Sequence, residues 1–376
     1  MTRTLLVVAG EASGDLHGAQ ILEALKARCP DLRIIGVGGP RMTPLLDRKL
    51  ADIADLAVMG LTEVIRHLPR LLRLKRALLQ AALEEGVEGA LLIDYQDFNR
   101  SLAKALRKAR PSIHLAQYVC PQVWVWRAGR IPKIGRLFDT LYCLLPFEPP
   151  LFQGLPVEAV YLGNPLVDEV HPETDADTFL REHHLDPALP VVAVLPGSRP
   201  GEILRLMPVL TEALRLWPTD PCRPRVQWVL PVAASLNPEW IRGLLGDLPV
   251  TLTRQAHVAR SVARAALVCS GTATLETALL GTPSVLFYKV SALTALLGRM
   301  LVKVAHIGLV NIIADRRLVP ELIQEEVTAP HLVAELERLL DPVVARAQRE
   351  ALAGIREKLG PPGAAARVAQ HLAGHL

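Results

Sequence analysis

The sequence has no long apolar run, and its first residues do not show the pattern expected of a secretory signal. No uninterrupted stretch of about 18 apolar residues occurs, which argues against a membrane-spanning helix. The nearest approach, residues 290–314, is broken by Arg299, Lys303 and His306. The first residues pass directly into an apolar segment without a small-residue cleavage site, so we expect no signal peptide and a cytoplasmic protein.

Cysteines, aromatic residues and net charge are also sparse. The five cysteines form no CxxC pair and have no histidine nearby at ligand spacing, which favours reduced thiols over disulfides or a zinc site. We therefore expect no metal and no cofactor. A net charge of +4 with 4% aromatic residues argues against a nucleic-acid partner.

Short apolar runs alternate with longer helical patterns along most of the chain. The predicted strands are residues 5–9, 33–37, 90–93, 113–119, 141–145, 191–195, 226–230, 266–269 and 284–287. All-apolar strands separated by helices are typical of parallel α/β sheets covered on both faces.

The alternation lapses in a polar stretch rich in proline and aspartate, residues 166–190, which we interpret as a linker. The sequence thus predicts two Rossmann-like α/β domains, 1–165 and 191–345, facing each other across a cleft. We expect the helices of 346–376 to pack back on the first domain. Ligands of such sheets bind at the carboxyl ends of the strands, so the segments that follow strands are the candidates for chemistry.

The first strand is followed by GEASGDLHG, residues 10–18, and by a helix expected to begin near Leu16. Its polar side chains are those of Glu11, Ser13, Asp15 and His17. Backbone N–H groups at a helix start can bind an anion or a sugar. The alternative is a tight turn in which Ser13 or Asp15 caps the helix. The glycine spacing differs from GxGxxG, so no dinucleotide fingerprint is present.

Two carboxylates follow the strand at 90–93, in the segment DYQDFN. A carboxylate at a strand's carboxyl end can act as a general base toward an attacking hydroxyl, and Asp94 and Asp97 are the candidates. The alternative is that Asp97 caps the next helix and Asp94 hydrogen-bonds the turn. One residue can do both, so both interpretations stay open.

Two strand–glycine–helix junctions in the second half predict a diphosphate site that needs no metal ion. They are residues 195–199, with Arg199, and 270–276, SGTATLE. Helix N-termini carry about half a positive charge, and an arginine can bind phosphate through two N–H groups. Glu276 can accept hydrogen bonds from ribose hydroxyls. The alternative is two glycine turns that only allow close packing. No Walker lysine follows either turn, which disfavours a P-loop ATPase.

Taken in order, the motifs resemble those of the lipid-A-disaccharide synthase family. They are GEASGDLHG (10–18), GVGGPRM (36–42), MGLTEV (59–64), YVCPQVWVWR (118–127), LPFE (145–148), LPGSR (195–199), SGTATLE (270–276) and NIIA…LVPELIQEE (311–326). Each string is modest evidence alone, but the ordered set is specific and spans about residues 5–340.

The resemblance implies an inverting, metal-independent glycosyltransferase of the GT-B fold, with an acceptor-binding first domain and a UDP-sugar-binding second domain. It implies transfer of 2,3-diacylglucosamine from UDP-diacylglucosamine to 2,3-diacylglucosamine 1-phosphate, giving a β-1,6-linked disaccharide 1-phosphate and UDP. The candidate catalytic residues are Asp97 as base, with Asp94 and His17 as alternatives. The candidate substrate-binding residues are Glu11, Ser13, Asp15, Asn99 and Met59. The candidate UDP-binding residues are Arg199, Ser270, Gly271, Thr272, Thr274, Glu276, Asn311, Glu321 and Gln324.

The chain departs from the family's pattern at Tyr95-Gln96, where a small residue and a proline are usual, and at Asn164, where histidine is common. These departures leave the exact acceptor and the acyl-chain length open. The alternatives are another GT-B enzyme, such as a glycolipid synthase or a UDP-sugar epimerase, and a non-catalytic nucleotide-sugar sensor on a membrane. A homodimer is compatible with the sequence.

Residues 61–80 predict a basic amphipathic helix of the kind that binds anionic membrane surfaces. Its apolar residues are Leu68, Leu71, Leu72, Leu78 and Leu79, and its basic residues are Arg66, Arg70, Arg73, Lys75 and Arg76. We therefore expect a peripheral protein at the inner face of the cytoplasmic membrane. The alternative is a surface helix whose apolar stripe faces the core. Residues 293–304 form a second, weaker candidate.

Overall fold

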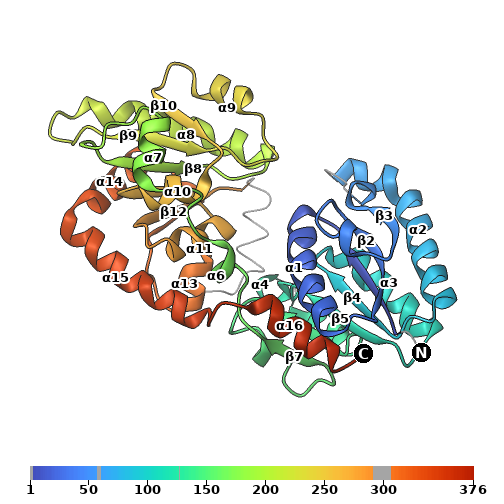
Figure 1. Ribbon diagram of the computed structural model, residues 1–376. Helices are drawn as coiled ribbons and strands as arrows, with labels where there is room; N and C mark the ends of the chain where they lie inside the picture. Colours follow the sequence, from blue (N-terminus) through green and yellow to red (C-terminus); the bar gives the residue numbers. More distant parts are fainter. Residues whose placement is uncertain (1–2, 57–60, 127, 291–305) are drawn as a thin grey trace. The chain divides into compact units, whose positions relative to one another are not determined.

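The computed structural model describes residues 3–56, 61–126, 128–290 and 306–376 (Figure 1). The chain divides into two compact units, Met1–Pro165 together with Pro361–Leu376, and Leu166–Gly360. Met59 and the segment 293–304 lie outside the described residues.

The first unit contains a seven-stranded parallel sheet in the order β3-β2-β1-β4-β5-β6-β7. Its strands are β1 (Thr4–Ala9), β2 (Arg33–Gly38), β3 (Arg48–Asp52), β4 (Gly89–Ile93), β5 (His114–Tyr118), β6 (Thr140–Cys143) and β7 (Glu158–Tyr161). The strand order reverses between β1 and β4, the switch point at which ligands of Rossmann-type sheets bind. Ala9 pairs with Ile93, so the loops after β1 and β4 start next to each other.

Helices cover both faces of this sheet. They are α1 (Ala12–Arg28), α2 (Leu61–Glu84), α3 (Gln96–Ala109), α4 (Val123–Trp126), α5 (Ile131–Gly135) and α16 (Ala364–Ala373). Strand residues alternate between the faces. Leu6 and Val8 pack with α2 and α3, whereas Leu5 and Val7 pack with α1 and α16. Burial on both faces explains why β1 is a continuous apolar run.

The second unit repeats this plan in a six-stranded parallel sheet, in the order β10-β9-β8-β11-β12-β13. The strands are β8 (Val191–Leu195), β9 (Gln227–Pro231), β10 (Val250–Thr253), β11 (Ala265–Cys269), β12 (Ser284–Tyr288) and β13 (Glu321–Ile323). The helices are α6 (Leu166–Glu169), α7 (Ala176–Glu182), α8 (Pro200–Leu216), α9 (Pro238–Leu245), α10 (Ala256–Ser261), α11 (Thr272–Leu279), α13 (Leu309–Ala314), α14 (Ala329–Leu340) and α15 (Pro342–Lys358). The switch point lies between β8 and β11.

The unit boundaries differ from the expected ones in two places. The segment 166–190 belongs to the second unit, because Phe179 of α7 is fully buried in its core beside Val258. Of the C-terminal helices, α14 and α15 belong to the second unit, and the chain returns to the first unit only from Pro361 onward. There α16 packs against α1 (Figure 1).

Candidate active site

Three non-glycine residues that follow the carboxyl ends of strands in the first sheet adopt the left-handed backbone conformation. Asp94 (φ 50°) and Tyr95 (φ 41°) follow β4, and Val119 (φ 70°) follows the adjacent strand β5. Such conformations cost of order 1–3 kcal/mol each and cluster at functional sites. Val119 is the clearest outlier, because a β-branched side chain disfavours positive φ. Backbone geometry therefore makes this end of the sheet a candidate site independently of the motifs.

Asp94, Asn99 and His17 lie together at the switch point of the first unit. Asp94 is half-buried, and burial raises the pKa of its carboxyl group against the opposing effects of the Tyr95 N–H and of His17. The amide of Asn99, which is fully buried, donates a 2.5 Å hydrogen bond to the Asp94 carbonyl. His17 comes from α1, and its ring centre is 6.0 Å from that of Tyr118. The loop after β4 and the first turns of α1 and α3 thus supply one polar cluster.

Asp97 is the exposed carboxylate of this region. It lies in the first turn of α3, and its side chain is 76% exposed. Tyr95 is the N-cap of α3, so Asp97 does not cap this helix. Its carboxylate accepts a 2.7 Å hydrogen bond from Arg100, and an Arg130 guanidinium nitrogen lies 3.7 Å away. These three side chains help to line a cavity of about 190 Å³ between α3 and residues 121–138. Asp97 is therefore within reach of a hydroxyl that enters this cavity.

The GEASGDLHG segment is more helical than the sequence indicated. Helix α1 begins at Ala12, four residues before Leu16, so neither Ser13 nor Asp15 caps it. Asp15 is 2% exposed. Its carboxylate accepts hydrogen bonds from the backbone N–H groups of Gly39 (2.6 Å), Arg41 (3.0 Å) and Met42 (3.0 Å). Glu11 and Ser13 are exposed at the start of the helix.

The unusual Tyr95-Gln96 pair fills the switch point. The Tyr95 ring lies where a side chain on Gly10 would be, and its hydroxyl donates to the Leu56 carbonyl at 2.9 Å. The Gln96 amide donates to the carbonyl of Val119 at 3.1 Å. The pair thus connects the loops after β1, β4 and β5. Asn164 is buried, and its amide donates to the Leu144 carbonyl at 2.8 Å.

In the second unit, both predicted phosphate turns lie at the switch point. Leu195, the last residue of β8, pairs with Val268 of β11, so the two turns start from adjacent strand ends. Gly197 (φ 111°) and Gly271 (φ 145°) adopt backbone conformations that favour glycine. Helices α8 and α11 begin directly after the turns. Two helix N-termini therefore meet at one point of the sheet edge, an arrangement suited to an anion.

Some residues of these turns have exposed side chains, and others are held by hydrogen bonds within the fold. Arg199 is 81% exposed, and its guanidinium pairs with Glu202 at 3.1 Å. Thr272 is exposed at the start of α11. Thr274 is buried, and its hydroxyl donates to the Gly271 carbonyl at 2.7 Å, which closes the turn. Ser270 is fixed by its N–H, which donates to the Phe287 carbonyl at 3.2 Å.

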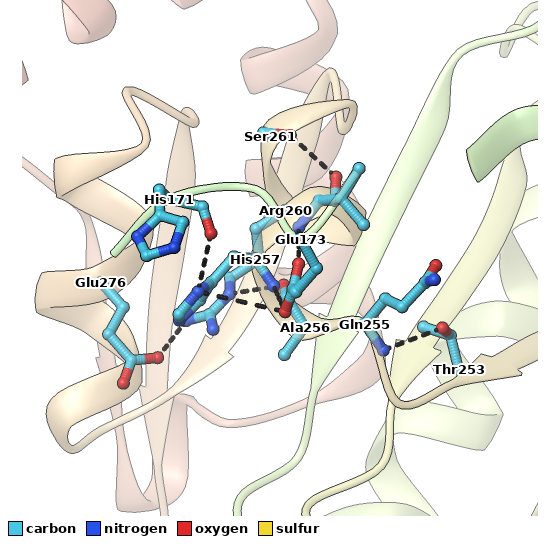
Figure 2. A network of polar contacts seen from close by, with 10 residues as sticks. His171, Glu173, Thr253, Gln255, Ala256, His257, Arg260, Ser261 and Glu276 are labelled. Carbon is cyan, nitrogen blue, oxygen red and sulfur yellow. Dashed lines mark hydrogen bonds and ion pairs between the residues drawn. The ribbon is translucent and has the colours of Figure 1, made fainter. Parts of the chain in front are cut away.

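Figure 2 shows the polar network that holds Glu276. Arg260 of α10 is almost fully buried, and its guanidinium is ion-paired with the Glu276 carboxylate. The Glu173 carboxylate caps the start of α10 by accepting hydrogen bonds from the N–H groups of His257 (3.0 Å) and Val258 (2.7 Å). The network thus links the 166–190 segment to Glu276 through α10.

Asn311 and Glu321 fasten the loop around α13. The Asn311 amide, fully buried, donates to the Val319 carbonyl and to the Glu321 carboxylate, both at 2.8 Å. The same carboxylate accepts hydrogen bonds from the backbone N–H groups of residues 307 and 308. Gln324 follows β13 at the carboxyl edge with φ 53°, and its side chain accepts a 2.7 Å hydrogen bond from the Val290 N–H. The hydrogen bonds of these three residues thus hold the backbone of the segments that lie near the carboxyl ends of β12 and β13.

A family model described as lipid-A-disaccharide synthetase matches residues 5–359. The chain belongs to this family. The lipid-A-disaccharide synthase of Syntrophus aciditrophicus is 44% identical over 373 residues, which cover 98% of this chain and 96% of the relative. That of Geobacter sulfurreducens is 42% identical over 369 residues, which cover 97% and 95%. The chain is thus a lipid-A-disaccharide synthase-like glycosyltransferase, and its family implies a nucleotide-sugar donor and a lipid acceptor.

Solved structures of low sequence identity show the same fold. A putative UDP-N-acetylglucosamine 2-epimerase from Listeria monocytogenes has a TM-score of 0.67 at 13% identity, with 100% of this chain and 97% of that chain covered. MurG of Acinetobacter baumannii has a TM-score of 0.60 at 12% identity, with both chains fully covered. The lipid-A-disaccharide synthase-like chain therefore has the two-domain α/β GT-B fold.

The motifs did not single out Arg100, Arg130 and Arg260, because the partners of these side chains are visible only in the folded protein.

Glu148, the last residue of the LPFE motif, is buried. It accepts hydrogen bonds from the Trp124 indole (3.2 Å) and from two backbone N–H groups, while burial raises its pKa to about 7. Cys120 and Cys143 lie beside it, but both carboxylate oxygens are already engaged by these donors. We therefore interpret Glu148 as a link between the 118–127 and 145–148 motifs.

Proposed function

We propose that the chain transfers 2,3-diacylglucosamine from UDP-diacylglucosamine to the 6-hydroxyl of 2,3-diacylglucosamine 1-phosphate, with inversion. The products are a β-1,6-linked disaccharide 1-phosphate and UDP. The observation that carries the proposal is the meeting of two glycine turns, each opening a helix, at the switch point of the second sheet.

On the donor side, the backbone N–H groups of both turns and the guanidinium of Arg199 bind the diphosphate. These donors stabilise the negative charge that develops as UDP leaves, so no divalent ion is required. The hydroxyls of Ser270 and Thr272 add hydrogen bonds, and Glu276 binds the ribose through a carboxylate oriented by Arg260. The backbone segments that bind the nucleotide are held in place by Asn311, Glu321 and Gln324.

On the acceptor side, Asp97 removes the proton from the attacking hydroxyl. Its exposure favours it over Asp94, which is half-buried, because a general base must come within hydrogen-bonding distance of the substrate. Arg100 and Arg130 face the same cavity and are suited to bind the 1-phosphate of the acceptor. The exposed Glu11 and Ser13 contribute hydrogen bonds to the sugar.

Acceptor-dependent release of UDP tests this function. UDP-diacylglucosamine alone should release little UDP, and adding diacylglucosamine 1-phosphate should raise the rate at least about tenfold, because direct displacement requires a nucleophile. Mass spectrometry should detect a tetraacylated disaccharide 1-phosphate. A UDP-sugar epimerase needs no acceptor, so equal turnover of the donor without acceptor would contradict the transfer reaction.

We further propose that the chain acts at the inner face of the cytoplasmic membrane through α2. No helix in the described ranges is long and apolar enough to cross a membrane. In α2, Leu78 is buried and Leu71 is half-buried against the core, whereas Leu68 and Leu72 are exposed. Arg70, Arg73 and Arg76 are also exposed, whereas Lys75 is half-buried and donates a 3.1 Å hydrogen bond to the Ser101 hydroxyl. One helix thus presents a core-facing stripe and a second surface suited to an anionic interface.

High salt should weaken binding to anionic vesicles, because screening reduces the attraction of basic side chains. The double variant Arg73→Gln, Arg76→Gln should lose roughly fivefold in vesicle affinity per removed charge, or about 1 kcal/mol each. Sedimentation with vesicles measures both effects. The double variant Arg346→Gln, Arg356→Gln of α15 removes the same charge elsewhere and should bind as the wild type does. Salt-insensitive binding would count against the electrostatic contribution.

A further inference from the structure

Three potential metal ligands lie together at the end of the first sheet where its parallel strands begin. Glu158 is the first residue of β7, and His371 lies in the last turn of α16. His375 follows two residues after the end of this helix. The His371 Nε2 atom is 3.3 Å from Oε1 of Glu158, and the His375 Nε2 atom is 3.4 Å from Oε2. All three ligand atoms lie within 4.8 Å of one another.

We propose that Glu158, His371 and His375 bind a divalent transition-metal ion of the Zn²⁺ type, which ties α16 to β7. Imidazole and carboxylate ligands suit this class of ion. Ligand atoms about 2.0–2.2 Å from a tetrahedral ion lie about 3.3–3.5 Å from each other. The two nitrogen–oxygen distances, each to a different oxygen of Glu158, are 3.3 and 3.4 Å and fall within this range.

Neighbouring side chains orient both histidine rings. The Tyr142 hydroxyl lies 3.2 Å from Nδ1 of His371. When Nε2 coordinates the ion, Nδ1 keeps its proton and donates it to this hydroxyl, as the outer nitrogen of metal-bound histidines usually does. The His375 ring is stacked on that of His114, with centres 4.6 Å apart and planes inclined by 10°. His114 is itself held by a 3.1 Å hydrogen bond to the Thr140 hydroxyl.

The location indicates a structural role for the ion. The side chains of His371, His375 and Glu158 are 22%, 35% and 50% exposed, so an ion and its remaining water ligands can reach them. Glu158 begins its strand, whereas the segment with Asp94 and Asp97 follows the end of β4. The three ligands therefore lie where the parallel strands of the sheet begin, and the candidate base lies where they end. Helix α16 returns to the first unit from the second, and the ion would fasten it there.

Competition of the purified protein with a chromogenic chelator for Zn²⁺ tests this inference. We expect one Zn²⁺ per chain, with affinity reduced at least about tenfold in His371→Gln and in His375→Gln, and about 10-fold to 100-fold in Tyr142→Phe. Zn²⁺ should also raise the melting temperature of the wild type but not of the double histidine variant, because a ligand stabilises only the state that binds it.

The variant His331→Gln removes an exposed histidine from α14 and serves as the matched control, with unchanged Zn²⁺ affinity expected. The Co²⁺ derivative distinguishes the histidine site from the cysteines, because thiolate ligands give charge-transfer absorption that imidazole and carboxylate do not. The inference is overturned if wild type and double histidine variant bind Zn²⁺ equally, or if the Co²⁺ spectrum shows thiolate ligation. Turnover should be unaffected by chelators, since the ion does not touch the substrate.

Discussion

Replacing Asp97 by asparagine is expected to reduce turnover by about 10²–10⁴-fold, the usual contribution of a general base. The amide is nearly isosteric but cannot accept the proton of the attacking hydroxyl. Because Asp97 is in the first unit and the phosphate turns are in the second, affinity for UDP should stay unchanged. Initial rates of disaccharide formation measure the first effect, and calorimetric titration with UDP measures the second.

Two further variants make this result specific. Asp31→Asn removes an exposed carboxylate from the same unit and should leave turnover unchanged. Asp94→Asn tests the half-buried alternative, and a loss smaller than that of Asp97→Asn is expected. Wild-type turnover in Asp97→Asn, with a large loss in Asp94→Asn, would transfer the role of base to Asp94. Loss of UDP binding in Asp97→Asn would instead indicate a general structural defect.

The central strands of both sheets could be predicted from the sequence, whereas the edge strands could not. All nine predicted strands are present, and none of their ends is shifted by more than two residues. The four that were missed, β3, β7, β10 and β13, are the outermost strands of their sheets. An outer strand has one neighbour and more solvent, so it carries polar residues and lacks the continuous apolar pattern. In β3, for example, Arg48 and Lys49 are exposed.

The phosphate turns could be predicted because their signal is local. A strand, a glycine and a helix start within a few residues of each other, and the strand order of a Rossmann-type sheet then brings the two turns together. The contacts of Asp97 and Glu276 depend instead on Arg130 and Arg260, which come from other elements. The same reason explains the misplaced start of α1, since a buried contact to the turn after β2 holds Asp15 inside the helix.

Replacing Asp15 by alanine is expected to lower the free energy of unfolding of the first unit by roughly 3–5 kcal/mol. The substitution leaves the backbone N–H groups of the buried residues Gly39 and Met42, and that of the exposed Arg41, without this acceptor. Each unsatisfied buried group costs about 1–3 kcal/mol. Urea unfolding followed by a probe in the first unit measures the loss. Ser13→Ala, which changes an exposed residue of the same turn of α1, should stay within about 0.5 kcal/mol of the wild type.

Asp15→Asn separates a structural role from direct contact with substrate. Oδ1 of Asp15 accepts from Gly39 and Met42 and Oδ2 from Arg41, so an asparagine oxygen can keep two of the three hydrogen bonds. We therefore expect a smaller loss of stability than in the alanine variant, and a nearly unchanged KM for the acceptor. A normal unfolding curve combined with a KM raised tenfold or more would show that this carboxylate binds the acceptor. The turn at residues 39–42 would then need another anchor, because the buried N–H groups of Gly39 and Met42 need an acceptor.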